Sequence, residues 1–196
     1  MKTGIIILAA GSSSRLGRPK QLLDYKGKTL LQTVIYEALK TDHKPVIVVL
    51  GAHAQEIAAL HKHNQINIVI NKNWKNGIAS SIVAGVSTMI KLHNEIESII
   101  IVVADQVFIK KSNFNNLIKK QKETGKNIIA SAYDGTIGTP VIFKKDYFQA
   151  LLSLKGTEGA KNILKQSAQD LETVFFEQGG IDIDTETDYN SLISQQ

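Results

Sequence analysis

A run of small residues and two cations near the N-terminus has the composition of a phosphate-binding loop. It spans residues 8–20, LAAGSSSRLGRPK, and directly follows the apolar run of residues 4–7. Gly11 permits a positive φ and a close approach of the backbone to a ligand, and the serines after it add hydrogen-bond donors without bulk. Arg15 can bind a phosphate through two parallel hydrogen bonds, and Lys20 adds a compact positive charge. The residues expected to contact the nucleotide are consecutive: Leu8, Ala9, Ala10, Gly11, Ser12 and Ser13.

The spacing of this loop excludes two other phosphate-binding motifs. A P-loop needs Lys and then Ser or Thr directly after its second glycine, but Gly17 is followed by Arg18 and Pro19. A dinucleotide-binding fingerprint needs G-x-G-x-x-G, but three serines follow Gly11. The structural alternative is a flexible, Ser-rich turn after an edge strand.

Carboxylates at two distant places could hold a metal ion beside the phosphates. Asp105 follows the apolar strand predicted at 98–103, and a carboxylate there must be solvated, paired or bound to a cation. Mg²⁺ prefers one or two carboxylates together with phosphate oxygens and water. Near the C-terminus, Asp182 and Asp184 would point the same way if their segment is extended. We predict Asp105 and Asp184 as the metal ligands, with Asp182 as the alternative to Asp184. The structural alternative is a helix N-cap or a turn residue for Asp105 and a helix N-cap for Asp184.

A third segment, residues 71–81, follows the strand predicted at 66–70 and opens a helix. Gly77, Ser80 and Ser81 can hydrogen-bond the edge of a nucleotide base, so we include them in the predicted nucleotide site. Trp74 could stack on a ligand, but ordinary loop packing explains it equally well, and we leave it out of the site.

Strands and helices alternate along the chain. Apolar runs predict strands at 4–7, 45–50, 66–70, 98–103 and 127–130, and apolar residues at helical spacing predict helices over about 28–39, 78–90 and 112–123, with Ser112 as an N-cap. Residues 133–140 are expected to form a turn-rich loop into a short strand at 141–143. Such alternation predicts an α/β domain with a mostly parallel sheet covered on both faces, whose ligands bind beyond the C-terminal ends of the strands.

Composition narrows the partners and the location. The 196 residues fit a single domain, and the net charge of +5 favours anionic partners. Lysines are spread along the whole chain without an RNA-binding motif, so we expect small phosphorylated substrates and no nucleic acid. Cysteine is absent, which excludes disulfides and thiol catalysis. No run is long enough to be a signal peptide or a membrane span, so a cytoplasmic location is expected.

Several motifs together resemble the MobA-like nucleotidyltransferases, and within them most closely the molybdenum cofactor cytidylyltransferases. The N-terminal loop matches the pattern L-A-A/G-G-x-S-x-R-M-G-x-x-K over its length. Ala10, where the guanylyl branch usually has Gly, favours the cytidylyl branch. The remaining matching segments are Pro19–Leu23, Val49–Ala52, Asn76–Ser81, Ala104–Gln106, Gly138–Val141 and Asp182–Thr185.

The resemblance implies a fold, a reaction and roles for these residues. The family fold is a Rossmann-like three-layer α/β/α domain of the nucleotide-diphospho-sugar transferase type, with the NTP in residues 1 to about 110 and the acceptor in residues 111–196. The implied reaction moves CMP from CTP to the terminal phosphate of molybdopterin and releases pyrophosphate. Lys20 and Arg15 would stabilise the developing charge, and Asp105 with Asp184 would hold Mg²⁺. A molybdoenzyme that receives the product is the implied protein partner.

The sequence departs from the family pattern on the acceptor side, which keeps alternatives open. Val107 stands where Pro is common, and the expected Gly-Asp-x-Gly-x-Arg segment is GTEGAK at 156–161. The alternatives are a GTP-dependent guanylyltransferase, a sugar-phosphate nucleotidyltransferase, or a non-catalytic module that binds nucleotide or cofactor for a molybdoenzyme.

Overall fold

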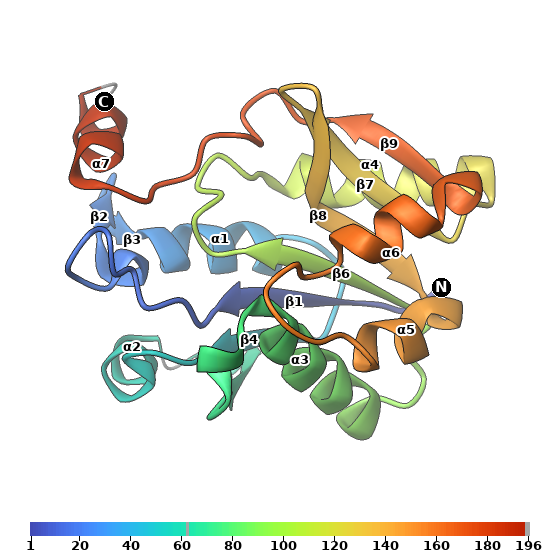
Figure 1. The fold of residues 1–196 in the computed structure, drawn as a ribbon, viewed down its shortest axis with the longest axis horizontal. Coiled ribbons are helices and arrows are strands. Elements are labelled where there is room, and N and C mark those ends of the chain that lie inside the picture. The colour runs from blue at the N-terminus through green and yellow to red at the C-terminus, as the bar shows by residue number, and fades with distance from the viewer. Residues whose placement is uncertain (62, 195–196) are drawn as a thin grey trace.

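A seven-stranded sheet forms the centre of the protein (Figure 1), which we describe from a computed structural model of residues 1–61 and 63–194. The strand order is β5-β4-β1-β6-β8-β7-β9, and only β8 runs against the others. The strands are β1 (Thr3–Ala9), β4 (Val46–Leu50), β5 (Ile66–Ile70), β6 (Ser98–Val103), β7 (Ile128–Tyr133), β8 (Thr136–Lys144) and β9 (Leu171–Phe175). A separate two-stranded ribbon pairs β2 (Asp24–Tyr25) with β3 (Lys28–Thr29).

Helices cover both faces of the sheet (Figure 1), because the central strands β1, β4 and β6 are buried on both sides. On one face lie α1 (Leu30–Leu39), α2 (Ala54–Leu60) and α4 (Lys111–Thr124). On the other lie α3 (Ile78–Leu92), α5 (Phe148–Leu152) and α6 (Lys161–Gln166). Alternate residues of β1 supply the two cores: Ile5 and Ile7 pack on the first face, and Ile6 and Leu8 on the second. The predicted three-layer α/β/α fold is confirmed.

The β7–β8 hairpin corrects the expected loop at residues 133–140. The chain turns at Asp134 and Gly135, and β8 already begins at Thr136. Pro140 therefore lies inside a strand, which is tolerated because the register shifts between Ala130 and Ser131 on the neighbouring strand. The N-cap expected at Ser112 is also wrong: the cap of α4 is Lys110, whose backbone N–H donates to Asn113 Oδ1 at 2.8 Å.

A third apolar cluster ties the two ends of the chain together. Leu16 and Leu23 from the N-terminal loop pack with Val107 after β6, and with Ile183 and Leu192 near the C-terminus. The last helix, α7 (Glu186–Ile193), lies beside β2 and β3 (Figure 1) and begins at a Thr185 capping box. We call residues 176–184, which lead from β9 to this helix, the C-terminal strap.

Among the described residues, no helix has the length and the apolar composition needed to cross a membrane.

Candidate functional site

The loop after β1 opens at the C-terminal edge of the sheet, where the ends of β4, β5 and β6 also lie. Hydrogen bonds from other parts of the protein engage the carbonyl groups of this loop. Gln21 Nε2 donates to Ala9 O at 3.0 Å and to Gly11 O at 3.1 Å. Ala52 N donates to Ala10 O at 3.1 Å. Within the described part of the chain, no backbone–backbone hydrogen bond uses the N–H of Gly11, Ser12 or Ser13 as its donor. These N–H groups can therefore serve an anion.

Positive φ in this loop falls on Ser13 (54°) and Gly17 (75°), so Gly11 does not adopt the left-handed conformation that glycine permits. A Cβ added at Gly11 would meet no atom within 4 Å, so this residue leaves open space at the loop. Ser13 also links the two ends of the loop, because its Oγ accepts a hydrogen bond from Lys20 N at 3.0 Å.

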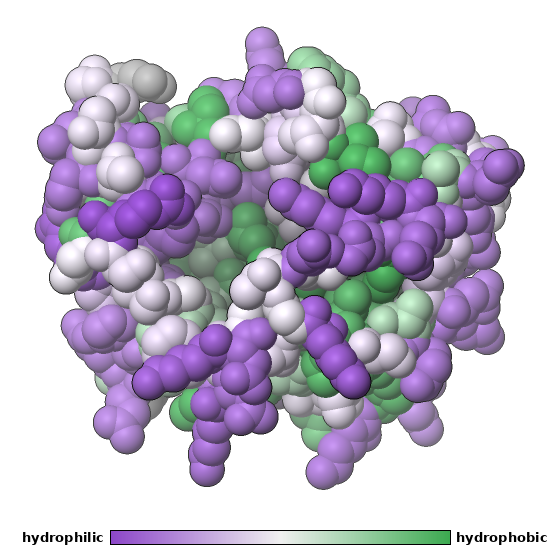
Figure 2. Space-filling view, in the orientation of Figure 1, coloured by the Kyte–Doolittle hydropathy of each residue, from purple (hydrophilic) through white to green (hydrophobic). Residues whose placement is uncertain are grey.

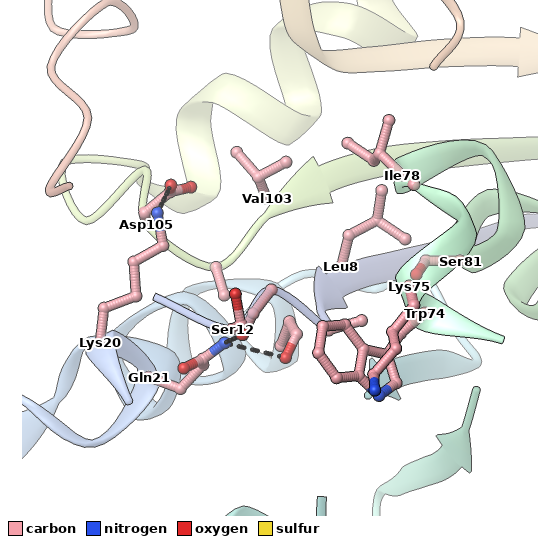
Figure 3. Close-up of a pocket in the computed structure, with 15 residues that line it drawn as sticks. Leu8, Ser12, Lys20, Gln21, Trp74, Lys75, Ile78, Ser81, Val103 and Asp105 are labelled. Carbon is pink, nitrogen blue, oxygen red and sulfur yellow. Dashed lines mark hydrogen bonds and ion pairs between the residues drawn. The ribbon is translucent and has the colours of Figure 1, made fainter. Parts of the chain in front are cut away.

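Lys20 joins the two carboxylates that the sequence places far apart. Its Nζ lies 2.5 Å from Asp105 Oδ2 and 2.8 Å from Asp184 Oδ1, and Arg15 Nη2 lies 2.6 Å from Asp184 Oδ2. The side chains of Lys20 and Asp105 are only 16% and 14% exposed, whereas Arg15 is 69% exposed. The predicted site residues Arg15, Lys20, Asp105 and Asp184 therefore lie together in space, at one side of a cavity (Figure 3 shows the Lys20–Asp105 pair).

The charges in this group depend on one another. Burial would lower the pKa of Lys20, but the charge of Asp105, with hydrogen bonds to Asp105 and Asp184, leaves it above its ordinary value. Burial would raise the pKa of Asp184, and Lys20 with Arg15 more than offsets this, so that pKa is lowered. Lys20 Nζ is thus within ion-pair distance of both carboxylates.

Asp182 differs from Asp184, its neighbour two residues on. Asp182 is exposed to solvent, and the protein atoms around its carboxylate bury it only in part. This burial, together with the charges of Asp105 and Asp184, raises the pKa of Asp182 to about 6. Asp182 lines a second cavity, whereas Asp184 hydrogen-bonds to Lys20 and Arg15.

The first cavity, of about 350 Å³, lies between the loop and the start of α3. Figure 3 shows Lys20 and Asp105 at one side, Trp74 at the other, and Leu8 and Val103 between them. The predicted residues that line it are Leu8, Ala9, Ala10, Gly11, Ser12, Lys20, Gly77, Ser81 and Asp105. Figure 2 shows a hollow with hydrophobic atoms at its floor between hydrophilic borders.

Two of the predicted serines, Ser13 and Ser80, form hydrogen bonds within the protein and do not line this cavity. Ser13 Oγ accepts from Lys20 N, and Ser80 Oγ lies within hydrogen-bond distance of Asn73 O, at 2.9 Å, and of Gly77 O, at 2.8 Å. Both are absent from the residues that line the first cavity. Arg15 and Asp184 also lie outside that lining, and among the described residues Arg15 contacts the group through Asp184.

Six lining residues were not in the predicted site: Gln21, Trp74, Lys75, Ile78, Val103 and Ala104. Trp74 is seated on Gly51, where a Cβ would lie 2.6 Å from Trp74 Cβ and 2.7 Å from Ala10 O. The indole therefore approaches because residue 51 has no side chain. The signal for Trp74 was its place shortly after the end of β5, and for Gln21 its position next to Lys20.

The second cavity, of about 580 Å³, continues from the first, since both are lined by Leu8, Ile78, Val103 and Asp105. Its further walls come from β8, from the segment before α6 and from the C-terminal strap. Its charged lining residues are Asp105, Asp134, Glu158, Lys161 and Asp182. Asp105 therefore lies at the junction between two adjoining cavities, each large enough for part of a substrate.

The donor set suits a hard cation that also binds a ligand. Asp105 Oδ1 is buried and has no hydrogen-bond partner in the part of the chain that the structure describes, while Asp105 Oδ2 and Asp184 Oδ1 both accept from Lys20. Among the described residues, no three side chains of His, Cys, Asp or Glu are grouped so that they could hold a metal by themselves. One or two carboxylates completed by phosphate oxygens and water is the arrangement that Mg²⁺ favours.

Comparison with known proteins identifies the family. The model of the MobA-like NTP transferase domain matches residues 5–171, which is most of the chain and includes the loop after β1 and Asp105 but neither the strap nor α7. The chain belongs to the MobA-like NTP transferase family. The resemblance predicted from the N-terminal loop and the later motifs is confirmed.

Relatives within and around this MobA-like family carry different names. Nicotine blue oxidoreductase of Paenarthrobacter nicotinovorans is 30% identical over 193 residues, which cover 92% of this chain and 91% of that protein. Molybdenum cofactor cytidylyltransferase of Escherichia coli is 37% identical over 83 residues, which cover 41% of this chain and 42% of that protein. A solved structure of Rv0371c from Mycobacterium tuberculosis H37Rv, in complex with manganese, superposes with a TM-score of 0.83 at 22% identity and covers all of both chains.

Proposed function

We propose that this MobA-like protein is a Mg²⁺-dependent nucleotidyltransferase that moves CMP from CTP to the terminal phosphate of molybdopterin and releases pyrophosphate. The observation that carries the proposal is the position of Lys20, which lines the first cavity, between Asp184 and Asp105, the carboxylate that lines both cavities. In this proposal the loop after β1 holds the nucleotide, and the half of the chain after about residue 110 forms most of the acceptor site.

The roles of the residues follow from the charges that the reaction develops. An oxygen of the acceptor phosphate forms a bond to the α-phosphorus of CTP, and the bond to the bridging oxygen of the leaving pyrophosphate breaks. The acceptor oxygen is already anionic, so the step needs no general base. Lys20 and Arg15 would balance charge on the triphosphate, while the N–H groups of the loop bind its oxygens. The hydrophobic floor of the cavity limits water beside the reacting atoms.

A divalent cation fits this arrangement. Asp105 and Asp184 would hold Mg²⁺, and the unpartnered Asp105 Oδ1 provides an oxygen that Lys20 does not use. When bound, the ion would neutralise phosphate charge and orient the triphosphate. The manganese in the Mycobacterium tuberculosis Rv0371c structure, a protein with the same fold, supports a divalent cation for this chain.

The choice of CTP and molybdopterin rests on sequence similarity. The Escherichia coli cytidylyltransferase supports both, over less than half of the chain. Ala10 in the loop favours the cytidylyl branch of the family. GTP in place of CTP, or a sugar phosphate in place of molybdopterin, are the alternatives on the same site.

Pyrophosphate release, measured with CTP, GTP, ATP or UTP and with molybdopterin or a sugar 1-phosphate, tests this proposal. We expect release only with CTP, molybdopterin and Mg²⁺ together. Lys20→Met should lower kcat/KM by at least about 100-fold, because a buried charge beside the phosphates is lost. Asp24→Asn, an exposed carboxylate on β2, is the matched control and should leave kcat/KM unchanged. Turnover with a sugar phosphate alone would contradict the acceptor, and CTP binding without turnover would favour a non-catalytic carrier module.

One relative raises an oxidoreductase activity as a second candidate function. The nicotine blue oxidoreductase is similar over 92% of this chain, and the second cavity combines an apolar wall with carboxylates that could accept hydrogen bonds from a heteroaromatic compound. Loss of the nicotine blue absorbance in the presence of the protein and a reduced nicotinamide cofactor would favour an oxidoreductase. No loss of absorbance alongside pyrophosphate release would favour the transferase.

A further inference from the structure

Two buried glutamines hold the backbone on the two sides of the candidate site. We propose that Gln21 is a positioning residue for the nucleotide and Gln106 a positioning residue for the acceptor. The inference rests on the proposed function for its assignment of the two sides. The two side chains are 2% and 1% exposed, and each amide nitrogen donates to two backbone carbonyls.

Gln21 acts on the loop after β1. Its Nε2 donates to the carbonyls of Ala9 and Gly11, and Ala52 N donates to the carbonyl between them. Three consecutive carbonyls, which would repel phosphate oxygens, are thereby engaged away from the ligand (Figure 3 shows the hydrogen bonds of Gln21). Without these contacts a peptide unit could rotate and present its carbonyl to the phosphates, so Gln21 keeps the loop in its anion-binding conformation.

Gln106 acts on the opposite side, next to Asp105. Its Nε2 donates to Thr139 O at 2.8 Å and to Gly179 O at 2.9 Å. Thr139 lies on β8 and lines the second cavity, and Gly179 lies on the C-terminal strap. One amide thus joins the end of β6, a cavity wall and the segment that carries Asp182, so Gln106 sets the width of the second cavity.

The residue type is constrained at both positions. Backbone carbonyls only accept hydrogen bonds, so the atom that faces them must be a donor. In both residues the amide oxygen is buried and has no partner among the described residues, which costs free energy that an aliphatic side chain of similar size would avoid. The two donated hydrogen bonds offset this cost, and in both cases they act on backbone at the site.

Near-isosteric substitutions that remove the donor, together with an amide oxygen that has no partner among the described residues, test the assignment. Gln21→Met should raise the KM and the calorimetric Kd for CTP by about tenfold, with the acceptor KM unchanged, since the lost contacts shape the loop. Gln106→Met should raise the acceptor KM by a similar factor and leave the CTP Kd unchanged. Each variant is the matched control for the other. A role in folding alone predicts equal changes in both KM values, or none, and either result would overturn the proposal.

A second variant covers the case in which a methionine variant does not fold. Gln21→Glu keeps the shape of the side chain, but it donates a hydrogen bond only when its carboxyl is protonated. The CTP affinity of this variant relative to wild type should therefore improve as the pH is lowered from 8 to 5.5. An affinity ratio to wild type that is constant with pH would contradict the role of Gln21. If the protein binds CTP but no acceptor supports turnover, the proposed function fails, while the CTP Kd values of Gln21→Met and Gln106→Met still decide whether Gln21 positions the nucleotide loop.

Discussion

At the scale of single residues, the two aspartates of the C-terminal strap are in opposite electrostatic situations. Asp184 is held by Lys20 and Arg15, which lower its pKa despite burial. Asp182, near Asp105 and Asp184 and without a hydrogen bond to either cation, has its pKa raised to about 6 by burial and by those charges. Side chains two residues apart therefore respond to pH in opposite directions.

The pH dependence of stability should separate these two aspartates. Between about pH 4 and pH 6 the native state keeps a proton on Asp182 that the unfolded state has lost, so its contribution falls as pH rises through about 6. The free energy of unfolding of Asp182→Asn, relative to that of wild type, should therefore be higher at pH 7.5 than at pH 4.5. The difference should be less than about 1 kcal/mol because solvent screens the residue.

Asp184→Asn is the control with the opposite sign. Its lowered pKa means that its contribution is present above the unfolded value of about 4 and is lost as pH falls. This variant should lose stability relative to wild type at pH 7.5 and lose less at low pH. Urea midpoints at the two pH values measure both effects. The same direction of change in both variants would contradict the assignment of their pKa shifts.

At the scale of elements, the C-terminal strap passes close to the β7–β8 hairpin at Gly179 and Gly180, which have no side chains. A Cβ added at Gly179 would collide with the rings of Tyr133 and Phe176. Tyr133 and Phe176 pack edge to face, with ring centroids 6.5 Å apart, so neither ring can move without losing this contact. The strap depends on this close approach to bring Asp182 and Asp184 to the rim.

Gly179→Ala should displace the strap. We expect a loss of stability of about 1–3 kcal/mol from overpacking, and a larger loss of activity than this implies, because Asp184 moves with the strap. Thermal unfolding and pyrophosphate release measure the two effects. Tyr133→Leu in the Gly179→Ala background relieves the collision and should recover part of the stability, whereas strictly additive losses would show that the ring is not the obstacle.

The elements differ in how far their own residues determine them. Runs of β-branched residues were enough to predict β4 and β6 to within one residue, since these strands are buried on both faces. The strand predicted at 4–7 was too short, because β1 runs from Thr3 to Ala9 and includes two residues that were assigned to the loop. The start of β8 was missed because Thr136, Gly138 and Pro140 are typical of turns, and only the pairing with β7 makes them a strand. Helix α2 was also missed: its N-cap, His53, has a left-handed backbone conformation and makes no capping hydrogen bond, so its sequence carries no start signal.

The candidate site shows the same division. Lys20 and Asp105 follow parallel neighbouring strands, and the rule that such strand ends meet at one edge was enough to bring them together. The contacts of Asp184 depend on the strap and its crossing of the hairpin, which no local pattern determines. The carbonyl contacts of Gln21 and Gln106 depend on tertiary packing in the same way.

At the scale of the whole molecule, the sheet places the nucleotide loop next to β6, while β8 and the strap close the site from the other side. The net charge of +5 favours anionic substrates in general, but the carboxylates at the junction oppose them locally. Lys20 reduces this opposition by pairing with both Asp105 and Asp184. Its charge is therefore already engaged before a triphosphate binds.

This arrangement predicts that CTP and Mg²⁺ stabilise the protein cooperatively. CTP alone would have to draw Lys20 away from two carboxylates and leave them unpaired at a partly buried site, which is costly. With Mg²⁺ present the carboxylates keep a positive partner while Lys20 turns to the phosphates, so both sets of charges are paired. At about 100 times the dissociation constant, binding contributes about 2.7 kcal/mol, or a rise in Tm of roughly 5–10 °C for a chain of this size.

Thermal unfolding with CTP in EDTA, with Mg²⁺ alone, and with both measures this coupling. The rise in Tm with both should exceed the sum of the separate rises, and Asp184→Asn should reduce that excess because one of the two carboxylates no longer needs a cation. Glu186→Gln, which removes the exposed partner of Arg18 outside both cavities, should keep it. Equal rises with and without Mg²⁺ would mean that Lys20 leaves the carboxylates at no cost, and the pairing at the junction would then not link nucleotide binding to the metal.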